Sequence, residues 1–274
     1  MGTLDISDLV ALAMVVLVGL PHGAFDAAVA NYLGASRNSL TAVRFFFLYF
    51  LAAASVTFLW IIFPGPSLAI FLAISMLHFG LGDANADSLP TYSVQIIAHG
   101  GVVVFGIIFY HAEEVTFLFD LLTVGGVAPA FWLANTFAQF LPIVILIYAG
   151  LAIAQPEVRT RFFELIILAV IFFFLSPLVG FAVYFCFIHT GRHMHLIWKK
   201  LRLVSKAKVL CVQAAGFTLM SWLLGAGAIF SIGSDDLDVS ILRVVFIGLA
   251  SLTVPHMVLV DGFFRKEIRI SERI

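Results

Sequence analysis

The segment HTGRH places His189 and His193 four residues apart inside an otherwise apolar run, in a chain that has eight histidines in all. Residues four apart share one face of a helix. Ionisable groups within an apolar helix are costly and usually face the interior of a bundle, where they pair or bind something. Imidazole is the commonest metal ligand in proteins. The pair therefore predicts a buried binding site on one helix face.

The composition predicts an integral membrane protein of the all-α class. Of 274 residues, 62% are hydrophobic and 11% are charged, and a soluble domain of this length could not bury so much apolar surface. Because each spanning helix takes about 20 apolar residues, the chain has no room for a separate soluble domain. We expect one transmembrane helical domain over residues 1–274. The net charge of −1 lacks the basic face that nucleic acid requires.

Apolar runs bounded by Gly, Pro and charged residues predict about nine transmembrane helices in one bundle. The expected helices are Ser7–Tyr32, Thr41–Phe63, Pro66–Asn85, Tyr92–Tyr110, Ala128–Ala152, Thr160–Leu175, Pro177–Trp198, Ala207–Ile232 and Val239–Phe263. Pro177 separates the sixth helix from the seventh, because it removes a backbone donor and disfavours helix at Ser176. The shorter run Val115–Leu122 is typical of a helix that lies in the membrane interface.

The basic residues predict the orientation of these helices. With nine spans, all of the 15 Lys and Arg residues except Arg243 fall on one side. Positively charged loops stay in the cytoplasm, so the N-terminus is expected outside and the C-terminus inside. The predicted location is the cell membrane, as a multi-pass protein surrounded by membrane lipids.

Five histidines share one predicted depth in the membrane. They lie on four helices that run from outside to inside, on the order of 18 to 25 Å below the outer ends at about 1.5 Å per residue. They are His22, His78, His189, His193 and His256. A group of imidazoles that needs no carboxylate ligand suits iron, zinc or copper. The sequence therefore predicts an intramembrane metal site.

An aspartate follows three of these histidines by four or five residues. The pairs are His22 with Asp26, His78 with Asp83, and His256 with Asp261. Metal-binding histidines usually donate their second ring N–H to a carboxylate or a carbonyl, which sets the tautomer. We expect the three aspartates to support the ligands in this way, the alternative being capping or structural pairing at helix ends. We expect His256 itself to lie beside the ligands.

The remaining histidines and the two cysteines are given structural roles. His99 comes close to the predicted layer from the fourth helix, His111 is expected in a loop, and His195 at the membrane interface. Cys186 and Cys211 lie in apolar segments and are interpreted as packing residues. Some of the 29 Phe side chains would line an apolar tunnel for a long hydrophobic ligand, but the sequence does not say which.

The motifs GLPHGAFD, LHFGLGDA, FIHTGRH and PHMVLVD occur in this order over nearly the whole chain. With them the chain resembles the bacterial and archaeal Brp/Blh family of β-carotene 15,15'-dioxygenases. The resemblance implies a non-haem ferrous iron, Fe(2+), held by His22, His78, His189 and His193. It also implies cleavage of β-carotene by dioxygen into two all-trans-retinal molecules, which would supply a rhodopsin-type apoprotein.

Two alternatives use the same histidines. A haem-binding membrane cytochrome would clamp haem between histidines of facing helices and would show a Soret band. A metal transporter lined by histidines would spread them through the depth of its pore, whereas the five predicted here share one layer. A zinc intramembrane protease is disfavoured because the chain has no HExxH motif.

Overall fold

The computed structural model describes residues 4–35, 38–232 and 236–267. Every regular element in these ranges is helical, which confirms the predicted all-α class. The chain forms two compact units: the first comprises Met1–Ala11 and Phe63–His189, and the second Leu12–Ile62 and Thr190–Ile274. The expectation of a single domain stays a prediction. Arg37, Arg269 and Arg273, which the orientation argument used, lie outside the described residues.

Seven helices within the described ranges are long and apolar enough to cross a membrane. They are Ile6–Tyr32, Ser39–Ile62, Pro64–Asp83, Leu89–Tyr110, Ala128–Ala154, Ala207–Ser231 and Leu237–Glu267. Each coincides, within a few residues, with a helix expected from the sequence, so the chain is a polytopic membrane protein. The two other expected spans correspond to a helix of 16 residues, Arg159–Phe174, and to the histidine-bearing helical stretch Pro177–Leu201.

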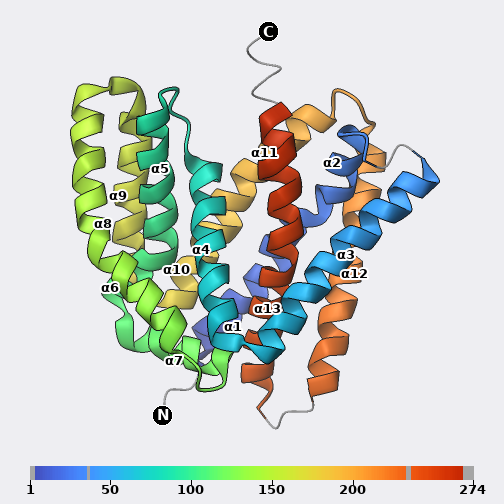
Figure 1. The fold of residues 1–274 in the computed structure, drawn as a ribbon, viewed down its shortest axis with the longest axis horizontal. Helices are drawn as coiled ribbons and strands as arrows, with labels where there is room; N and C mark the ends of the chain where they lie inside the picture. Colours follow the sequence, from blue (N-terminus) through green and yellow to red (C-terminus); the bar gives the residue numbers. More distant parts are fainter. Residues whose placement is uncertain (1–3, 36–37, 233–235, 268–274) are drawn as a thin grey trace. The chain divides into compact units, whose positions relative to one another are not determined.

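The first unit is built around α4, α5 and α8, which contact one another (Figure 1). Helix α1 begins before the boundary between the units, with the Asp5 carboxylate accepting hydrogen bonds from the Ser7 hydroxyl and the Asp8 N–H. The Ser7 hydrogen bond holds the pKa of Asp5 below its ordinary value. The elements are α1 (Ile6–Met14), α4 (Pro64–Asp83), α5 (Leu89–Gly101), η3 (Val102–Gly106), α6 (Ile107–Tyr110), α7 (Ala112–Thr123), α8 (Ala128–Ala154), η4 (Pro156–Val158), α9 (Arg159–Phe174), α10 (Pro177–Val183) and η5 (Tyr184–His189).

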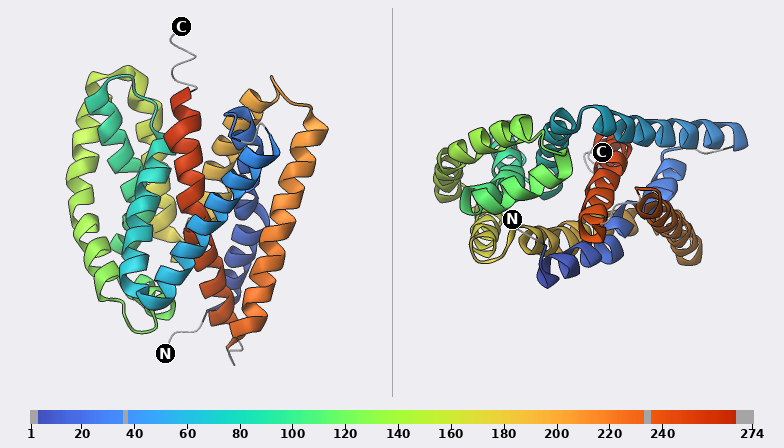
Figure 2. Two further views of the ribbon diagram at one scale, coloured as in Figure 1. Left: turned by 45° about the vertical axis from the view of Figure 1, so that its right-hand side comes forward. Right: turned by 90° about the horizontal axis from the view of Figure 1, so that it is seen from below.

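Two glycines let α4 and α5 approach closely. A Cβ atom on Gly80 would overlap the backbone carbonyl of Ile96, and a Cβ atom on Gly100 would overlap that of Met76. Small residues at such crossings allow helix backbones to pack directly within a membrane. The two helices lie side by side in both views of Figure 2. This contact fixes α4, which carries His78.

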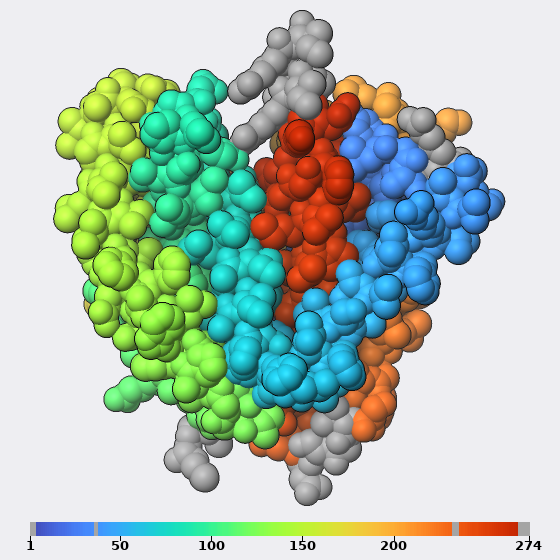
Figure 3. Space-filling model, in the orientation of Figure 1, coloured from blue at the N-terminus to red at the C-terminus, as the bar shows by residue number. Residues whose placement is uncertain are grey.

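The second unit contains the end of α1 and eight further elements. They are η1 (Val15–Gly19), η2 (Leu20–Phe25), α2 (Asp26–Tyr32), α3 (Ser39–Ile62), α11 (Thr190–Leu201), α12 (Ala207–Ile232), α13 (Leu237–Met257) and η6 (Val258–Phe264). Helix α3 packs against α13, and Figure 3 shows their side chains in contact along the visible face. A hydrogen bond of 2.8 Å between the Thr57 and Ser251 hydroxyls joins these two helices. The Trp222 indole N–H donates to the Val16 carbonyl and ties α12 to η1.

Changes of helical pitch lie beside most of the buried histidines. Within the described residues, η1, η3, η5 and η6 are π-helical turns, and η2 is a 3₁₀ turn. His22 lies in η2, directly after η1, and His189 ends η5. His99 and His256 lie within three residues of η3 and η6. Single π turns inside α-helices occur frequently at functional sites. The sequence predicted helices at these places without the change of pitch.

Candidate metal centre

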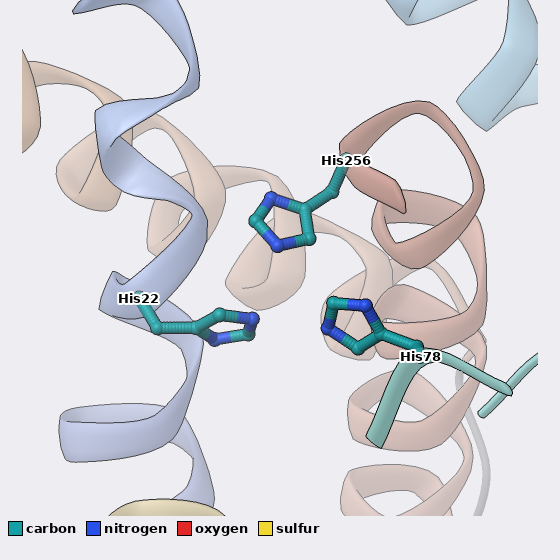
Figure 4. Close-up of side chains that lie close together, drawn as sticks. All are labelled: His22, His78 and His256. Atoms are coloured by element: carbon teal, nitrogen blue, oxygen red, sulfur yellow. The ribbon is translucent and has the colours of Figure 1, made fainter. Parts of the chain in front are cut away.

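Three imidazoles gather within the second unit. His22 of η2, His193 of α11 and His256 of α13 are all buried. Their ring centroids are 5.4 Å apart for His22 and His193, 5.0 Å for His22 and His256, and 4.9 Å for His193 and His256. Figure 4 shows the rings of His22 and His256 projecting into the space between η2 and α13. The three rings form a nearly equilateral triangle.

The tautomers of two of these rings follow from their hydrogen bonds. Nδ1 of His22 lies 2.6 Å from the Gly19 carbonyl oxygen, and Nδ1 of His256 lies 2.8 Å and 3.0 Å from the two Asp26 carboxylate oxygens. Carbonyl and ionised carboxylate oxygens only accept hydrogen bonds, so each Nδ1 carries the hydrogen and donates. Nε2 is therefore the lone-pair nitrogen of both rings, the form in which histidine binds a metal.

Asp26 links three segments of the second unit. Its side chain is fully buried, and it accepts a 2.7 Å hydrogen bond from the Tyr49 hydroxyl as well as the bond from His256. A buried carboxylate is tolerated when donors compensate its lost hydration. The bonds join α2 to α3 and α13, so Asp26 sets the orientation of the His256 ring.

The first unit holds a second pair of imidazoles. The rings of His78 on α4 and His189 at the end of η5 are buried, with centroids 4.9 Å apart; the ring of His78 is also drawn in Figure 4. Phe79 meets the His189 ring edge-on at 4.8 Å, and Phe185 stacks on it at 5.8 Å with an angle of 13° between the ring planes. This pair lies among aromatic rings, an environment suited to an apolar ligand.

Asp83 is the buried carboxylate of the first unit. It accepts a 2.9 Å hydrogen bond from the Tyr184 hydroxyl, and its nearer oxygen lies 3.9 Å from Nδ1 of His99. That second distance is too long for a hydrogen bond. His99 is fully buried, and no motif in the sequence marks it. The available signal was its predicted depth, close to that of the other histidines.

The third predicted aspartate has a different neighbour. The Asp261 carboxylate accepts a 2.7 Å hydrogen bond from Nε of Arg265, four residues further along the chain. Asp26, from the PHGAFD motif, lies within hydrogen-bond distance of His256. The structure thus joins His256 to the motif of His22, at a separation of 230 residues.

The structure also describes the two other histidines and the two cysteines. His111 lies between α6 and α7, and its Nε2 donates a 2.9 Å hydrogen bond to the Phe172 carbonyl. His195 is exposed on α11. Cys186 is buried and Cys211 is exposed.

The fold and these side chains define the class of the protein, a polytopic helical membrane protein with a cluster of buried histidines. Sequence comparison then gives its family. The family model described as beta-carotene 15,15'-dioxygenase matches residues 13–264. The chain belongs to this family.

Two curated relatives agree with the family match. The chain is 41% identical over 266 residues to the beta-carotene 15,15'-dioxygenase of uncultured marine bacterium 66A03, with 94% of each chain covered. It is 26% identical over 210 residues to the probable beta-carotene 15,15'-dioxygenase Blh of Halobacterium salinarum, covering 67% of this chain and 59% of the relative. No solved structure matches the chain significantly.

Proposed function

We propose that this chain cleaves β-carotene at its central double bond with dioxygen and yields two molecules of all-trans-retinal. The observation that carries the proposal is the 41% identity to a β-carotene 15,15'-dioxygenase over 94% of both chains. The stoichiometry balances: the central carbon–carbon double bond is broken, and each of its two carbons gains one oxygen atom. The family match disfavours the haem cytochrome and the metal transporter.

The proposed cofactor is Fe(2+), held by His22, His78, His189 and His193. The donor set suits it, because imidazoles are good ligands for iron. Within each unit two of these rings lie about as close as two ligands of one ion, at 5.4 Å for His22 and His193 and 4.9 Å for His78 and His189. That all four histidines bind the same ion is inferred from the resemblance to the family. When bound, the iron supplies the redox chemistry that activates dioxygen.

The chain's own residues would hold and shield the substrate. Phe79 and Phe185 surround the His189 ring in the first unit, and their apolar faces can pack against a conjugated polyene while excluding water. Asp26 and the Gly19 carbonyl hold two imidazoles of the second unit by their Nδ1–H groups. No side chain is assigned as a general acid or base.

The substrate is expected to reach the protein, and the product to leave it, through the membrane. β-Carotene dissolves in lipid, so a membrane enzyme can take it up laterally and release retinal to a rhodopsin-type apoprotein. We place the protein in the cell membrane with nine crossings, counting α9 and the stretch Pro177–Leu201 as spans, with the C-terminus in the cytoplasm. A fluorescent protein that matures only in the cytoplasm should therefore fluoresce when it is fused to the C-terminus. A C-terminal reporter enzyme that is active only in the periplasm should be inactive, and its activity would contradict this orientation.

The function is tested by expressing the chain in cells that accumulate β-carotene. We expect the cells to lose colour and to gain about two retinal molecules per β-carotene consumed, measured by chromatography of extracted pigments. The purified protein should contain iron and show no Soret band. A folded, iron-loaded protein that leaves β-carotene intact would overturn the proposal.

A further inference from the structure

His256 lies as close to His22 and His193 as those two lie to each other, although the resemblance gives the ligand role to other histidines. We propose that His256 is a further metal ligand, binding through Nε2 while Asp26 holds its Nδ1–H. The proposal rests on the metal site of the proposed function and uses only contacts within the second unit.

The spacing of the three rings fits coordination of one ion. With a metal–nitrogen bond of about 2.1 Å, an imidazole centroid lies about 3.2 Å from the ion. Two imidazoles at 90° to 109° about that ion then have centroids about 4.5 to 5.2 Å apart. The two distances from His256, 5.0 Å to His22 and 4.9 Å to His193, fall within this range. The distance between His22 and His193, 5.4 Å, lies just above it. By this measure His256 is placed as well as the predicted ligands are.

The hydrogen bonds select the required tautomer. Asp26 accepts from both the Tyr49 hydroxyl and Nδ1 of His256, at 2.7 Å and 2.8 Å. In the tautomer whose Nδ1–H donates to the Asp26 carboxylate, Nε2 of His256 carries the lone pair. A carboxylate that holds a histidine in this way raises its basicity as a metal ligand. His22 is held equivalently by the Gly19 carbonyl.

One motif then serves two ligands. PHGAFD supplies His22 itself and, four residues later, the carboxylate that orients His256. Tyr49 of α3 holds that carboxylate from its other side.

The test measures metal binding in the purified, detergent-solubilised full chain. Protein stripped of metal by a chelator is titrated with Fe(2+) under anaerobic conditions, and X-ray absorption of the loaded protein reports the number of imidazole ligands. We expect His256→Ala to weaken Fe(2+) binding by more than about tenfold and to lose one imidazole from the coordination shell. Added free imidazole should restore part of the affinity, which a purely structural role would not produce. His195→Ala, on the exposed side of α11, is the matched control.

An affinity and an imidazole signal equal to wild type in His256→Ala would overturn the assignment. If His256→Ala aggregates on size-exclusion chromatography, Asp26→Asn replaces it, since this change keeps the side-chain volume. There we expect affinity to fall by about 10- to 100-fold, and an unchanged affinity would refute the proposal.

The readout also separates this proposal from the function. Wild-type protein that binds iron through His256 but makes no retinal would leave the ligand assignment intact and overturn the proposed reaction. If the wild-type protein makes retinal and His256→Ala binds iron normally, the proposed reaction stands and the assignment of His256 as a ligand is overturned.

Discussion

Each of the two units contains a buried aspartate with a tyrosine and a histidine near it, but the distance from the aspartate to the histidine differs. Each has a buried aspartate that accepts a hydrogen bond from a tyrosine of another segment, at 2.7 Å for Asp26 and Tyr49 and 2.9 Å for Asp83 and Tyr184. In the second unit the carboxylate also contacts a clustered histidine at 2.8 Å, whereas in the first its distance to His99 is 3.9 Å.

This difference separates two roles of a buried carboxylate. A direct hydrogen bond sets which ring nitrogen carries the proton and how the ring is turned, so Asp26 acts on an imidazole of the cluster. At 3.9 Å the attraction between Asp83 and a protonated His99 would be electrostatic and would not define the ring's orientation. We therefore expect the second unit to depend more on its aspartate than the first.

The largest expected effect comes from removing an imidazole in either unit. His78→Ala and His193→Ala should each lower retinal formation by more than about a hundredfold, because each deletes a proposed ligand. The measurement is retinal extracted from β-carotene-accumulating cells, normalised to membrane protein. His195→Ala should retain activity. If His78→Ala stayed active while His193→Ala did not, the second unit alone would carry the site.

The aspartates test the comparison directly. Asp26→Asn should weaken Fe(2+) binding by about 10- to 100-fold, because Asp26 holds Nδ1 of the clustered His256 ring at 2.8 Å. Asp83→Asn should weaken it by less than about tenfold, because Asp83 lies 3.9 Å from His99. The Fe(2+) affinities of both variants are measured by competition with a chelator. Equal losses of affinity in Asp26→Asn and Asp83→Asn would show that Asp83 supports the metal as strongly as Asp26 does.

Two glycine-to-alanine substitutions, one in each unit, compare how tightly the helices pack around these positions. Gly80→Ala should destabilise the protein by about 1 to 3 kcal/mol, because the new methyl group would overlap the Ile96 carbonyl between α4 and α5. Gly216→Ala on α12 meets no heavy atom within 4 Å and should not destabilise it. Thermal unfolding in detergent, followed by helical circular dichroism, checks this. The same transition temperature for both variants would contradict the close crossing.

The smallest expected effects are those of the tyrosine hydroxyls. Tyr49→Phe and Tyr184→Phe should each cost about 0.6 to 1.7 kcal/mol of stability, the range of interhelical hydrogen bonds in membranes. Tyr49→Phe should also weaken Fe(2+) binding several-fold, because Tyr49 shares Asp26 with His256. A larger loss of affinity in Tyr184→Phe would reverse the comparison between the units.

Much of the helical fold was predictable from the sequence. The expected helix Ala207–Ile232 coincides with α12, and Ala128 begins α8 as predicted. In lipid a helix must satisfy its own backbone hydrogen bonds, so apolar length alone marks the spans. The stretch Pro177–Leu201 begins at Pro177 for the local reason that the sequence indicated.

The candidate site was predictable only in part. The burial of His22, His193 and His256 follows from their place in apolar helices, but which side each ring faces does not. An α-helix turns by about 100° per residue, so the π turn η1, directly before the segment of His22, changes the direction of the residues beyond it. The spacing in the sequence paired Asp26 with His22, and the contact of Asp26 with Nδ1 of His256 at 2.8 Å could not be read from it.

By itself, the sequence determined that the chain is an all-helical membrane protein, that several of its histidines lie within apolar helices, and which family's motifs it carries, because these depend on local composition and order. Only the tertiary structure decided that Asp26 contacts His256 and Tyr49, since the partners come from three segments distant in the chain. Helix rotation and packing bring such groups together, and neither is encoded in the spacing of residues along one segment.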